Sequence, residues 1–389
     1  MSSNTGKQQR NVEDAHKPMR VLFVLQDLHL GGIQRVNSTI ASALNSTEYD
    51  VSLLLTRPND AVYSSTCHTY TTRRDVKNFI FDGSRHVLRK IPFLSINNVS
   101  INRLYQFLRK HSFDVIILNP GFFSAAARIK QLYPRTRTLL WMHNNFDIYM
   151  DKYFADSQKE LGAAAREADG IICLERYTLS KWKAFNKNCY LIHNPTTIES
   201  DGKVADLNSK KIAFAGRLVI QQKGLDYLLQ IAELIPDDWY ISVAGSGQDE
   251  EQINAMAKER NLLAKLQFKG PLYGTDLLNH YLSSSILVMP SRWEGFSLVA
   301  VEAMSCGLPI VAFDIPAMRE ATDNGHFSLL ADYGNVASFA SELNSLIQSF
   351  EKRQRYSSLS LRRSKDFSIN SVVSTWQQML ADINSRAFR

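Results

Sequence analysis

The stretch ILVMPSRWEGFSLVAVEAMSCGLP, residues 286–309, places an apolar strand, a short polar loop and a helix in direct succession. The loop carries Glu294 with Gly295 directly behind it, and a second carboxylate, Glu302, lies more than one turn into the helix. A helix start attracts anions, so carboxylates beside a bound anion would repel it. We therefore expect the two glutamates to bind a different chemical group.

Backbone N–H groups and carboxylates around this helix start suit two parts of one ligand. The N–H groups that can hold a phosphate belong to Phe296, Ser297 and Leu298. Carboxylates accept hydrogen bonds from hydroxyls, and vicinal diols suit them well. A diphosphate between a ribose and a hexose has both features, with Glu302 on the ribose and Glu294 on the hexose. The alternative is that Glu294 is solvated and Glu302 lies on the helix surface.

A second motif, AFAGRLVIQQKGLDYLL at residues 213–229, places Lys223 six residues after Arg217. The arginine follows an expected strand, and the lysine stands at a helix start. Arginine binds phosphate through its planar fork and lysine binds it as a point charge. We expect both to converge on a diphosphate, and the alternative is two surface cations on a loop.

Apolar runs that alternate with helical patterns extend this arrangement to the whole chain. Such runs lie at 20–25, 115–118 and 170–173, and after a polar stretch they resume at 211–216 and 239–245. This alternation is typical of parallel sheets. We expect an α/β protein with two Rossmann-like, doubly wound domains that face each other across a cleft. The predicted segments are a mobile tail at 1–18, an N-terminal domain at 19–195, a linker at 196–210, a C-terminal domain at 211–365, and a helix at 366–389 that can cross back to the N-terminal domain.

The composition is that of an ordinary globular protein, with 389 residues, 44% hydrophobic and 21% charged. Its four cysteines form no CxxC pair or Cys/His cluster, which favours a reduced, cytoplasmic compartment. No apolar run reaches the roughly 20 residues that span a bilayer, and the first residues lack the apolar core of a signal peptide.

The net charge of +7 is concentrated between residues 61 and 140, which hold 13 Lys and Arg against 3 Asp and Glu. Such a window suits anionic lipid, nucleic acid or an anionic substrate, and equally a solvated surface. Within it, residues 84–111 interleave cations with apolar residues, which suits an anionic membrane surface unless the apolar residues belong to the core. The cations are Arg85, Arg89, Lys90, Arg103, Arg109 and Lys110, and the apolar residues are Val87, Leu88, Ile91, Phe93 and Leu94.

The succession of G-R-x5-K and E-x7-E in one domain resembles the retaining glycosyltransferases of family 4, which have the two-domain GT-B fold. The resemblance runs from Gly31 and Gly32, after the first strand, to the last helix. It implies a nucleotide-sugar donor bound mainly by the C-terminal domain. By this resemblance Arg217 and Lys223 hold the diphosphate, Glu294 and the backbone of 295–298 the sugar and phosphate, and Glu302 the ribose. The nucleobase would lie at Pro271 and Leu272.

In the N-terminal half, His143 ends a strand in LLWMHNN and is similar to a family histidine that faces the reacting sugar. The alternative is a structural histidine. The resemblance places Gly31 and Gly32 against the acceptor or diphosphate, whereas a tight turn is the simpler interpretation. We expect His143, Glu294, Arg217 and Lys223 to take part in catalysis. Asp147 and Glu175 are weaker candidates, since each suits an ordinary loop or surface acid, and VAGSGQ at 243–248 suits a plain turn.

The sequence identifies neither a carboxylate nucleophile for double displacement nor a DxD-like metal site. We therefore expect front-face transfer without metal or cofactor, from a nucleotide sugar, with UDP expected, to a glycan or lipid-linked acceptor. A position at the inner face of the cell membrane and a role in bacterial polysaccharide assembly follow from the resemblance. The rivals are a GT-B nucleotide-sugar epimerase and a non-catalytic nucleotide-sugar or nucleic-acid binding protein. Two cations with two carboxylates are not needed to bind a nucleic-acid backbone, so we expect no nucleic-acid partner.

Overall fold

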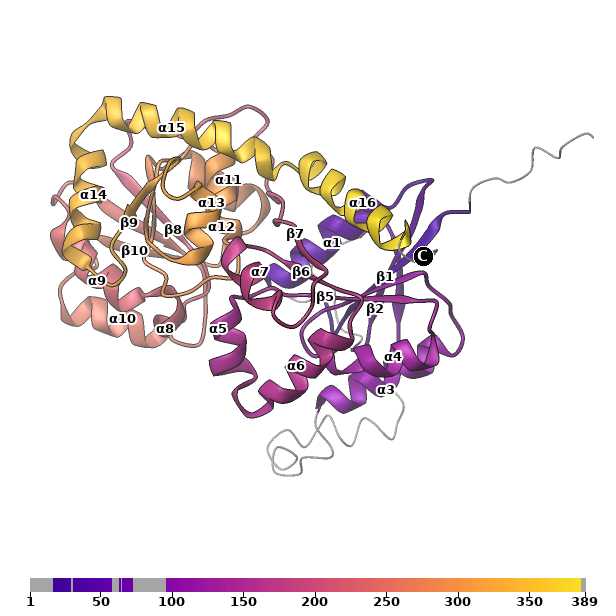
Figure 1. The fold of residues 1–389 in the computed structure, drawn as a ribbon. Coiled ribbons are helices and arrows are strands. Elements are labelled where there is room, and N and C mark those ends of the chain that lie inside the picture. The colour runs from indigo at the N-terminus through magenta and orange to yellow at the C-terminus, as the bar shows by residue number, and fades with distance from the viewer. Residues whose placement is uncertain (1–16, 29–30, 58–62, 64, 73–95, 386–389) are drawn as a thin grey trace, which may run out of the picture.

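The computed structural model describes residues 17–28, 31–57, 63, 65–72 and 96–385, which form two α/β domains (Figure 1). The strands of the first domain are β1 (Met19–Leu25), β2 (Tyr49–Leu55), β3 (His68–Thr71), β4 (Val115–Leu118), β5 (Arg137–Trp141), β6 (Gly170–Cys173) and β7 (Cys189–Leu191). Its helices are α1 (Gly32–Leu44), α3 (Ile96–Leu108), α4 (Ala126–Leu132), α5 (Phe146–Ile148), α6 (Gln158–Glu167) and α7 (Arg176–Trp182).

The second domain repeats this alternation after a linker. Its strands are β8 (Lys211–Ala215), β9 (Tyr240–Ala244), β10 (Leu266–Gly270), β11 (Ile286–Met289), β12 (Ile310–Phe313) and β13 (Leu329–Ala331). Its helices are α8 (Ile220–Lys223), α9 (Leu225–Leu234), α10 (Glu250–Glu259), α11 (Gly274–Leu282), α12 (Leu298–Ser305), α13 (Pro316–Thr322), α14 (Val336–Gln348) and α15 (Phe350–Ser364), with α16 (Ile369–Ser385) at the end of the chain.

Both sheets are parallel and doubly wound, which confirms the expected fold class. The first has the order β3-β2-β1-β4-β5-β6-β7, and the second has the order β10-β9-β8-β11-β12-β13. The strand order reverses between β1 and β4 in one sheet and between β8 and β11 in the other. Ligands of such sheets bind beyond the carboxyl ends of the strands at this reversal.

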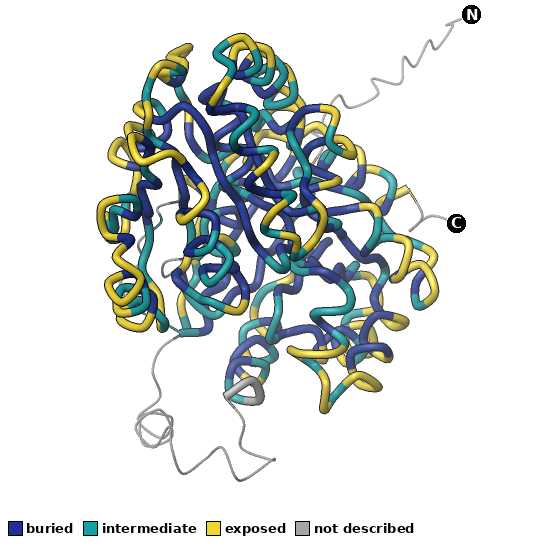
Figure 2. Tube along the Cα trace, turned by 90° about the vertical axis from the view of Figure 1, so that its left-hand side faces the viewer, coloured by how far each residue is buried: buried dark blue, intermediate teal, exposed yellow. Residues whose placement is uncertain are grey.

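The central strands are apolar because helices cover both faces of each sheet. Every residue of β4, β11 and β12 is buried, and Figure 2 shows the buried backbone running through the middle of the molecule. Continuous apolar runs of this kind are the pattern that allowed these strands to be predicted. The sheets are thereby rigid supports for the loops at their carboxyl ends.

The strands of the first sheet end at Leu191 and those of the second begin at Lys211, on either side of the predicted linker. Helix α16 then returns to the first domain, as Figure 1 shows. Its Trp376 ring lies 5.5 Å from the ring of Phe23 and 4.8 Å from that of Trp141, measured between centroids. Helix α16 therefore packs on the core of the N-terminal domain.

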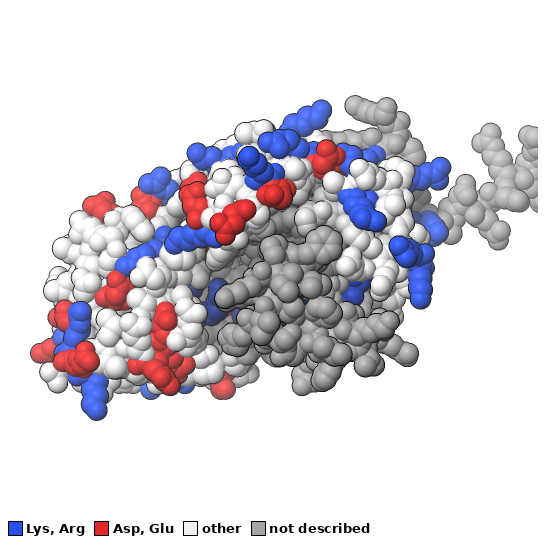
Figure 3. Space-filling view, turned by 90° about the horizontal axis from the view of Figure 1, so that it is seen from below, with Lys and Arg blue, Asp and Glu red and all other residues white. Residues whose placement is uncertain are grey.

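The basic segment at 84–111 is described only in part. Its cations Arg85, Arg89 and Lys90, and the apolar residues around them, lie outside the described residues. The expectation that Arg103 is a surface cation was wrong: it is 6% exposed, and its Nη1 donates to the carbonyl of Thr56. Arg109 and Lys110 are exposed. In Figure 3, Lys and Arg predominate over Asp and Glu on the described surface at the right, where the N-terminal domain lies.

Candidate functional site

Residues from separate motifs meet where the carboxyl ends of the two sheets face each other. A Cβ atom added to Gly295, after β11, would lie 1.9 Å from the carbonyl oxygen of His143, after β5. A Cβ atom added to Gly32, at the start of α1, would lie 3.3 Å from Cδ1 of Leu298, at the start of α12. The two domains are therefore in contact at these two glycines, next to Glu294 and at the start of α12.

A buried ion pair stands at the centre of the C-terminal part of the site. Lys223 Nζ lies 2.6 Å from Glu294 Oε1, and Ser291 donates to the same oxygen at 2.8 Å. Lys223 and Glu294 are 9% and 7% exposed. Among the described residues, Glu294 Oε2 has no hydrogen-bond partner. The interpretation of Glu294 as solvated is therefore wrong, and its second oxygen is available to a hydroxyl.

Arg217 lies in the loop after β8 and Lys223 is the last residue of α8, and their surroundings differ. Gly216 lies against the lysine, because a Cβ atom there would be 3.3 Å from Lys223 Cε. Arg217 is exposed, and the only hydrogen bond of its side chain among the described residues is from Nη2 to Gln222 Oε1 at 3.4 Å. A weakly held guanidinium beside a buried ammonium suits a phosphate that arrives with the ligand.

The first turn of α12 is held in place by its N-cap residue, Ser297. Ser297 accepts a hydrogen bond from the N–H of Ala300 through its side chain, and Phe296 is buried in a ring stack with His193 at 5.4 Å between centroids. The cap fixes the direction of the first helical turn. The N–H groups of Leu298 and Val299 in that turn lie ahead of the first helical hydrogen bonds and can meet an anion.

His143 is held by several contacts in the N-terminal domain. Its backbone N–H donates to Tyr149 Oη at 3.0 Å, its Nε2 lies 2.6 Å from Asn119 Oδ1, and its ring is 4.4 Å from the Trp141 ring. Burial lowers the pKa of His143 to about 3, so the imidazole is neutral. With its carbonyl against Gly295, the residue lies beside Glu294, where the family resemblance places the reacting sugar.

The carboxylate of Glu302 is buried, whereas a residue that binds the ribose is expected to be accessible. It is 1% exposed, and Oε1 lies 2.8 Å from Arg35 Nη1 and accepts from Thr197 Oγ1 at 2.6 Å. Tyr281 donates to Oε2 at 3.2 Å. Burial raises the pKa of Glu302 and these partners oppose the shift, Arg35 most strongly. Ribose binding remains a proposal, and it requires this buried carboxylate to become accessible.

The other predicted contacts lie on separate elements. Gly31 is half-buried before the first turn of α1, Pro271 is exposed after β10, and Leu272 is half-buried beside it. The turn within residues 243–248 packs on the residue that follows β8, because a Cβ atom on Gly245 would lie 1.8 Å from the carbonyl of Gly216. Close backbone packing accounts for that glycine, as the interpretation as a plain turn requires.

Two acids singled out in the sequence have structural roles. Glu175 is 1% exposed and caps α7 by accepting from the N–H of Thr178, so a surface position for it was wrong. Asp147 is half-buried and accepts from the hydroxyl of Tyr177 at 2.6 Å. Among the described residues, neither side chain hydrogen-bonds to Glu294 or Lys223.

Several residues of the junction were not predicted. Lys152, in the π-helical turn Tyr149–Tyr153, places Nζ 3.5 Å from the ring centroid of Trp293, next to Glu294. Arg35 and Asn119, described above, are also new. None of these residues belongs to a motif, and only the contact between elements distant in sequence reveals them.

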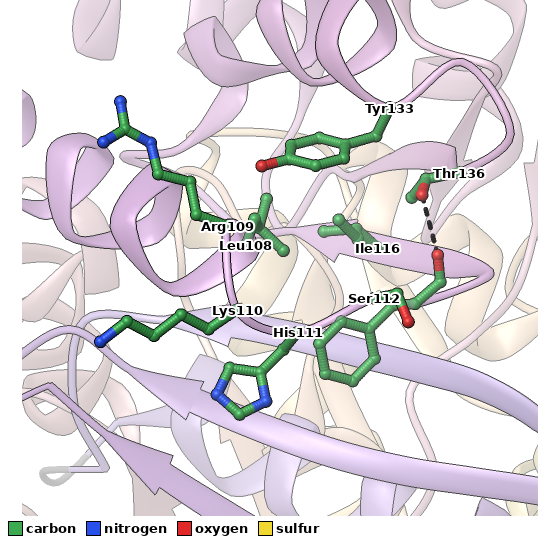
Figure 4. A pocket seen from close by; sticks show the side chains of 9 residues that line it. Leu108, Arg109, Lys110, His111, Ser112, Ile116, Tyr133 and Thr136 are labelled. Carbon is green, nitrogen blue, oxygen red and sulfur yellow. Dashed lines mark hydrogen bonds between the residues drawn. The ribbon is translucent and has the colours of Figure 1, made fainter.

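A cavity of about 320 Å³ lies elsewhere, at the amino ends of β4 and β5 (Figure 4). Tyr133 and Ile116 line it, while the charged ends of Arg109 and Lys110 extend away from the other lining residues. The cavity is at the amino ends of the strands, whereas the junction of the two domains is at their carboxyl ends.

Among the described residues, no group of three or more His, Cys, Asp or Glu side chains could hold a metal ion. None of the helices in the described ranges is long and apolar enough to cross a membrane.

Comparison with known families divides the chain as the fold does. Residues 30–200 match the family described as Glycosyltransferase Family 4, and residues 196–360 match Glycosyl transferases group 1. An uncharacterized glycosyltransferase of Haemophilus influenzae is 28% identical over 92% of this chain and 98% of its own length. The N-acetylgalactosamine-N,N'-diacetylbacillosaminyl-diphospho-undecaprenol 4-alpha-N-acetylgalactosaminyltransferase of Campylobacter jejuni is 24% identical over 88% of this chain and 94% of its own.

Solved structures show the same fold at lower identity. Sucrose-phosphate synthase of Thermosynechococcus elongatus superimposes with a TM-score of 0.78 at 16% identity, over 95% of this chain and 100% of that one. HepE of Anabaena, solved in complex with UDP and glucose, superimposes with a TM-score of 0.71 at 17% identity, over 94% of this chain and 100% of that one.

Proposed function

Since the chain is a glycosyltransferase of the GT-B, family 4 type, we propose that it moves a hexose or N-acetylhexosamine from UDP to a glycan or lipid-linked acceptor, with retention at the anomeric carbon. The observation that carries this proposal is the buried pair of Lys223 and Glu294 next to Gly295, which lies against the backbone of His143. It joins a cation for phosphate, a carboxylate for hydroxyls and a neutral imidazole at one junction.

The choice of donor and acceptor draws on similar proteins. HepE was solved with UDP and glucose, and the name of the Campylobacter relative gives its acceptor as a saccharide on diphospho-undecaprenol. We extend both features to this chain as a UDP-linked donor and a lipid-linked acceptor. The enzyme then works at the inner face of the cell membrane, and the exposed Arg109 and Lys110 are cations that can meet anionic headgroups there.

In the proposed reaction each residue keeps a simple role. Arg217 and the helix start of α12 bind the diphosphate, and Lys223 stabilises the charge that grows on it as the sugar leaves. Glu294 Oε1 is occupied by Lys223 and Ser291, so the carboxylate suits holding a sugar hydroxyl through Oε2 better than attacking carbon. We therefore propose front-face attack, in which the leaving diphosphate takes the proton of the acceptor hydroxyl.

The test begins with thermal stabilisation of the full chain by a panel of nucleoside diphosphates and nucleotide sugars. Transfer to saccharide acceptors follows, with the anomeric configuration of the product read by NMR from the coupling of its anomeric proton. We expect stabilisation by UDP and its sugars and an unchanged anomeric configuration. An inverted product would refute the front-face step, and the absence of stabilisation by any nucleotide sugar would refute the donor class.

Metal independence is a separate part of the proposal. Arg217, Lys223 and the helix start can offset the diphosphate charge without Mg²⁺. Transfer should continue in excess EDTA. Loss of transfer in EDTA with recovery on addition of Mg²⁺ or Mn²⁺ would show that a metal neutralises the diphosphate.

A further inference from the structure

Two buried asparagines lie behind His143 and were not singled out by any motif. Asn37 is on α1 and Asn119 directly follows β4, and they are 0% and 2% exposed. Their side-chain amides bond to each other in both directions. Asn37 Nδ2 donates to Asn119 Oδ1 at 3.0 Å, and Asn119 Nδ2 donates to Asn37 Oδ1 at 2.8 Å.

The orientation of each amide is fixed by the backbone. The Nδ2 group of Asn37 also donates to the carbonyl of Ile33 at 2.9 Å, and that of Asn119 also donates to the carbonyl of Val24 at 3.0 Å. A carbonyl oxygen can only accept, so the amide nitrogen must face it in both cases. Turning either amide over would place oxygen against oxygen in a buried site and leave donors without partners.

This orientation determines which nitrogen of His143 carries a proton. Asn119 Oδ1 lies 2.6 Å from Nε2 of the imidazole, and because an amide oxygen only accepts, Nε2 must donate. A neutral imidazole has one N–H, so Nδ1 carries the lone pair. Among the described residues Nδ1 has no hydrogen-bond partner. The ring is neutral because burial lowers the pKa of His143 to about 3.

We propose that the Asn37–Asn119 pair is a positioning device that holds His143 in the Nε2–H tautomer, so that Nδ1 accepts a hydrogen bond from a sugar hydroxyl of the substrate. The second half of this inference rests on the proposed function, since it needs a sugar beside Glu294. His143 is placed for it, because its carbonyl contacts Gly295, the next residue after Glu294. The pair thus makes His143 a hydrogen-bond acceptor and prevents it from acting as a cationic acid.

The tautomer can be measured without any substrate. In the full chain labelled with ¹⁵N histidine, long-range proton–nitrogen correlation spectra distinguish a protonated ring nitrogen from one with a lone pair. The signals of His143 are those that His143→Gln removes. We expect a protonated Nε2 and an unprotonated Nδ1. A protonated Nδ1, alone or together with Nε2, would overturn the proposal.

Variants then test whether the pair is the cause. Asn37→Ala removes one of the two acceptors that hold Nδ2 of Asn119 and leaves the carbonyl of Val24 as the other, so the Nδ1–H form of His143 should become detectable beside the Nε2–H form. The kcat should fall about tenfold, as for loss of one hydrogen bond, while UDP affinity is unchanged. The matched control is Asn186→Ala, another buried asparagine of this domain, whose Nδ2 donates to the carbonyls of Ala165 and Ala168.

The control should lose stability but keep the His143 tautomer and kcat. If both variants lower kcat equally and leave the tautomer unchanged, the pair has only a structural role and the proposal is wrong. If Asn37→Ala does not fold, the spectrum of the unaltered chain still tests which nitrogen of His143 carries the proton. If His143 has the predicted tautomer but the chain transfers no sugar, only the proposed function is refuted. If the chain transfers sugar but Nδ1 of His143 is protonated, only this inference is refuted.

Discussion

At the scale of single residues, the role proposed for Glu294 separates sugar recognition from nucleotide recognition. Its Oε1 is bound to Lys223 and Ser291, and its Oε2 has no partner among the described residues. Glu294→Gln should therefore leave UDP affinity in calorimetry unchanged and lower kcat by about one to two orders of magnitude, since a charged hydrogen bond to the sugar is lost. The control is Asp238→Asn, which removes the exposed pair with Lys210. A loss of UDP affinity in Glu294→Gln as large as its loss of kcat would refute the assignment.

A second residue-scale prediction concerns Glu302, because its proposed ribose site is occupied by Arg35 at 2.8 Å. If the nucleotide must displace the guanidinium, Arg35→Gln should tighten UDP binding. Glu302→Gln should weaken UDP and the UDP-sugar alike, because both carry the ribose. Calorimetry with both ligands measures the two effects. If the two variants weaken UDP binding to the same extent, the ion pair of Arg35 and Glu302 is only a structural contact between α1 and α12.

At the scale of elements, the loop after β11 and the loop after β5 can meet only because residue 295 is glycine. A Cβ atom there would lie 1.9 Å from His143 O and 2.8 Å from Asn144 Cα, and both of these are backbone atoms. Gly295→Ala should force the loops apart and lower kcat/KM by about 100-fold, the effect of a displacement near 1 Å. UDP affinity should persist, since the C-terminal domain is intact.

Gly202→Ala is the control for this substitution. Gly202 has φ +77° and no heavy atom within 4 Å of an added Cβ. Its replacement should lose about 1 kcal/mol of stability through backbone strain, with transfer unchanged. Normal kcat/KM in Gly295→Ala would show that the two loops do not need this contact.

The elements also show what the sequence could reveal. Strands such as β4 and β11 were predictable because continuous apolar runs mark buried parallel strands, and the loops after β8 and β11 because their motifs are local. Strand β3 was missed, since as a largely exposed edge strand it carries no apolar run. Arg35 and Asn119 were missed because their roles depend on partners far away in the chain. Arg103 was misjudged for the same reason, since its partner is the carbonyl that follows β2.

At the scale of the whole molecule, an ion pair across the domain boundary should make stability depend on pH. Glu320 of α13 accepts from His193 Nε2 at 2.8 Å and from the backbone N–H of Arg176 at 2.9 Å. Burial alone would raise the pKa of Glu320, but these bonds and charges outweigh it and hold the pKa below 4.5, its ordinary value. The ionised form therefore stabilises the fold above that value, and this contribution is lost as pH falls through the lowered pKa.

Glu320→Gln should accordingly lower Tm at pH 7, with a difference from the unaltered chain that shrinks as the solution is acidified below the ordinary pKa. Thermal unfolding across this pH range measures the difference. Glu351→Gln is a fitting control, since Glu351 is an exposed carboxylate whose pKa is also lowered but which spans no domain boundary. A Tm difference that stays constant with pH would mean that the charge of Glu320 does not contribute.

The uneven charge of the molecule leads to the last prediction, which concerns the membrane. Arg109 and Lys110 are exposed on the N-terminal domain, where cations predominate. Each cation near an anionic surface contributes about 1 kcal/mol, and salt screens that attraction. The full chain should therefore sediment with phosphatidylglycerol vesicles at low salt, but not with phosphatidylcholine vesicles or at high salt. Arg109→Glu with Lys110→Glu should weaken sedimentation, whereas Lys258→Glu with Arg355→Glu, on exposed cations of the C-terminal domain, should not. A chain that stays in the supernatant with anionic vesicles at low salt would instead indicate an acceptor free in solution.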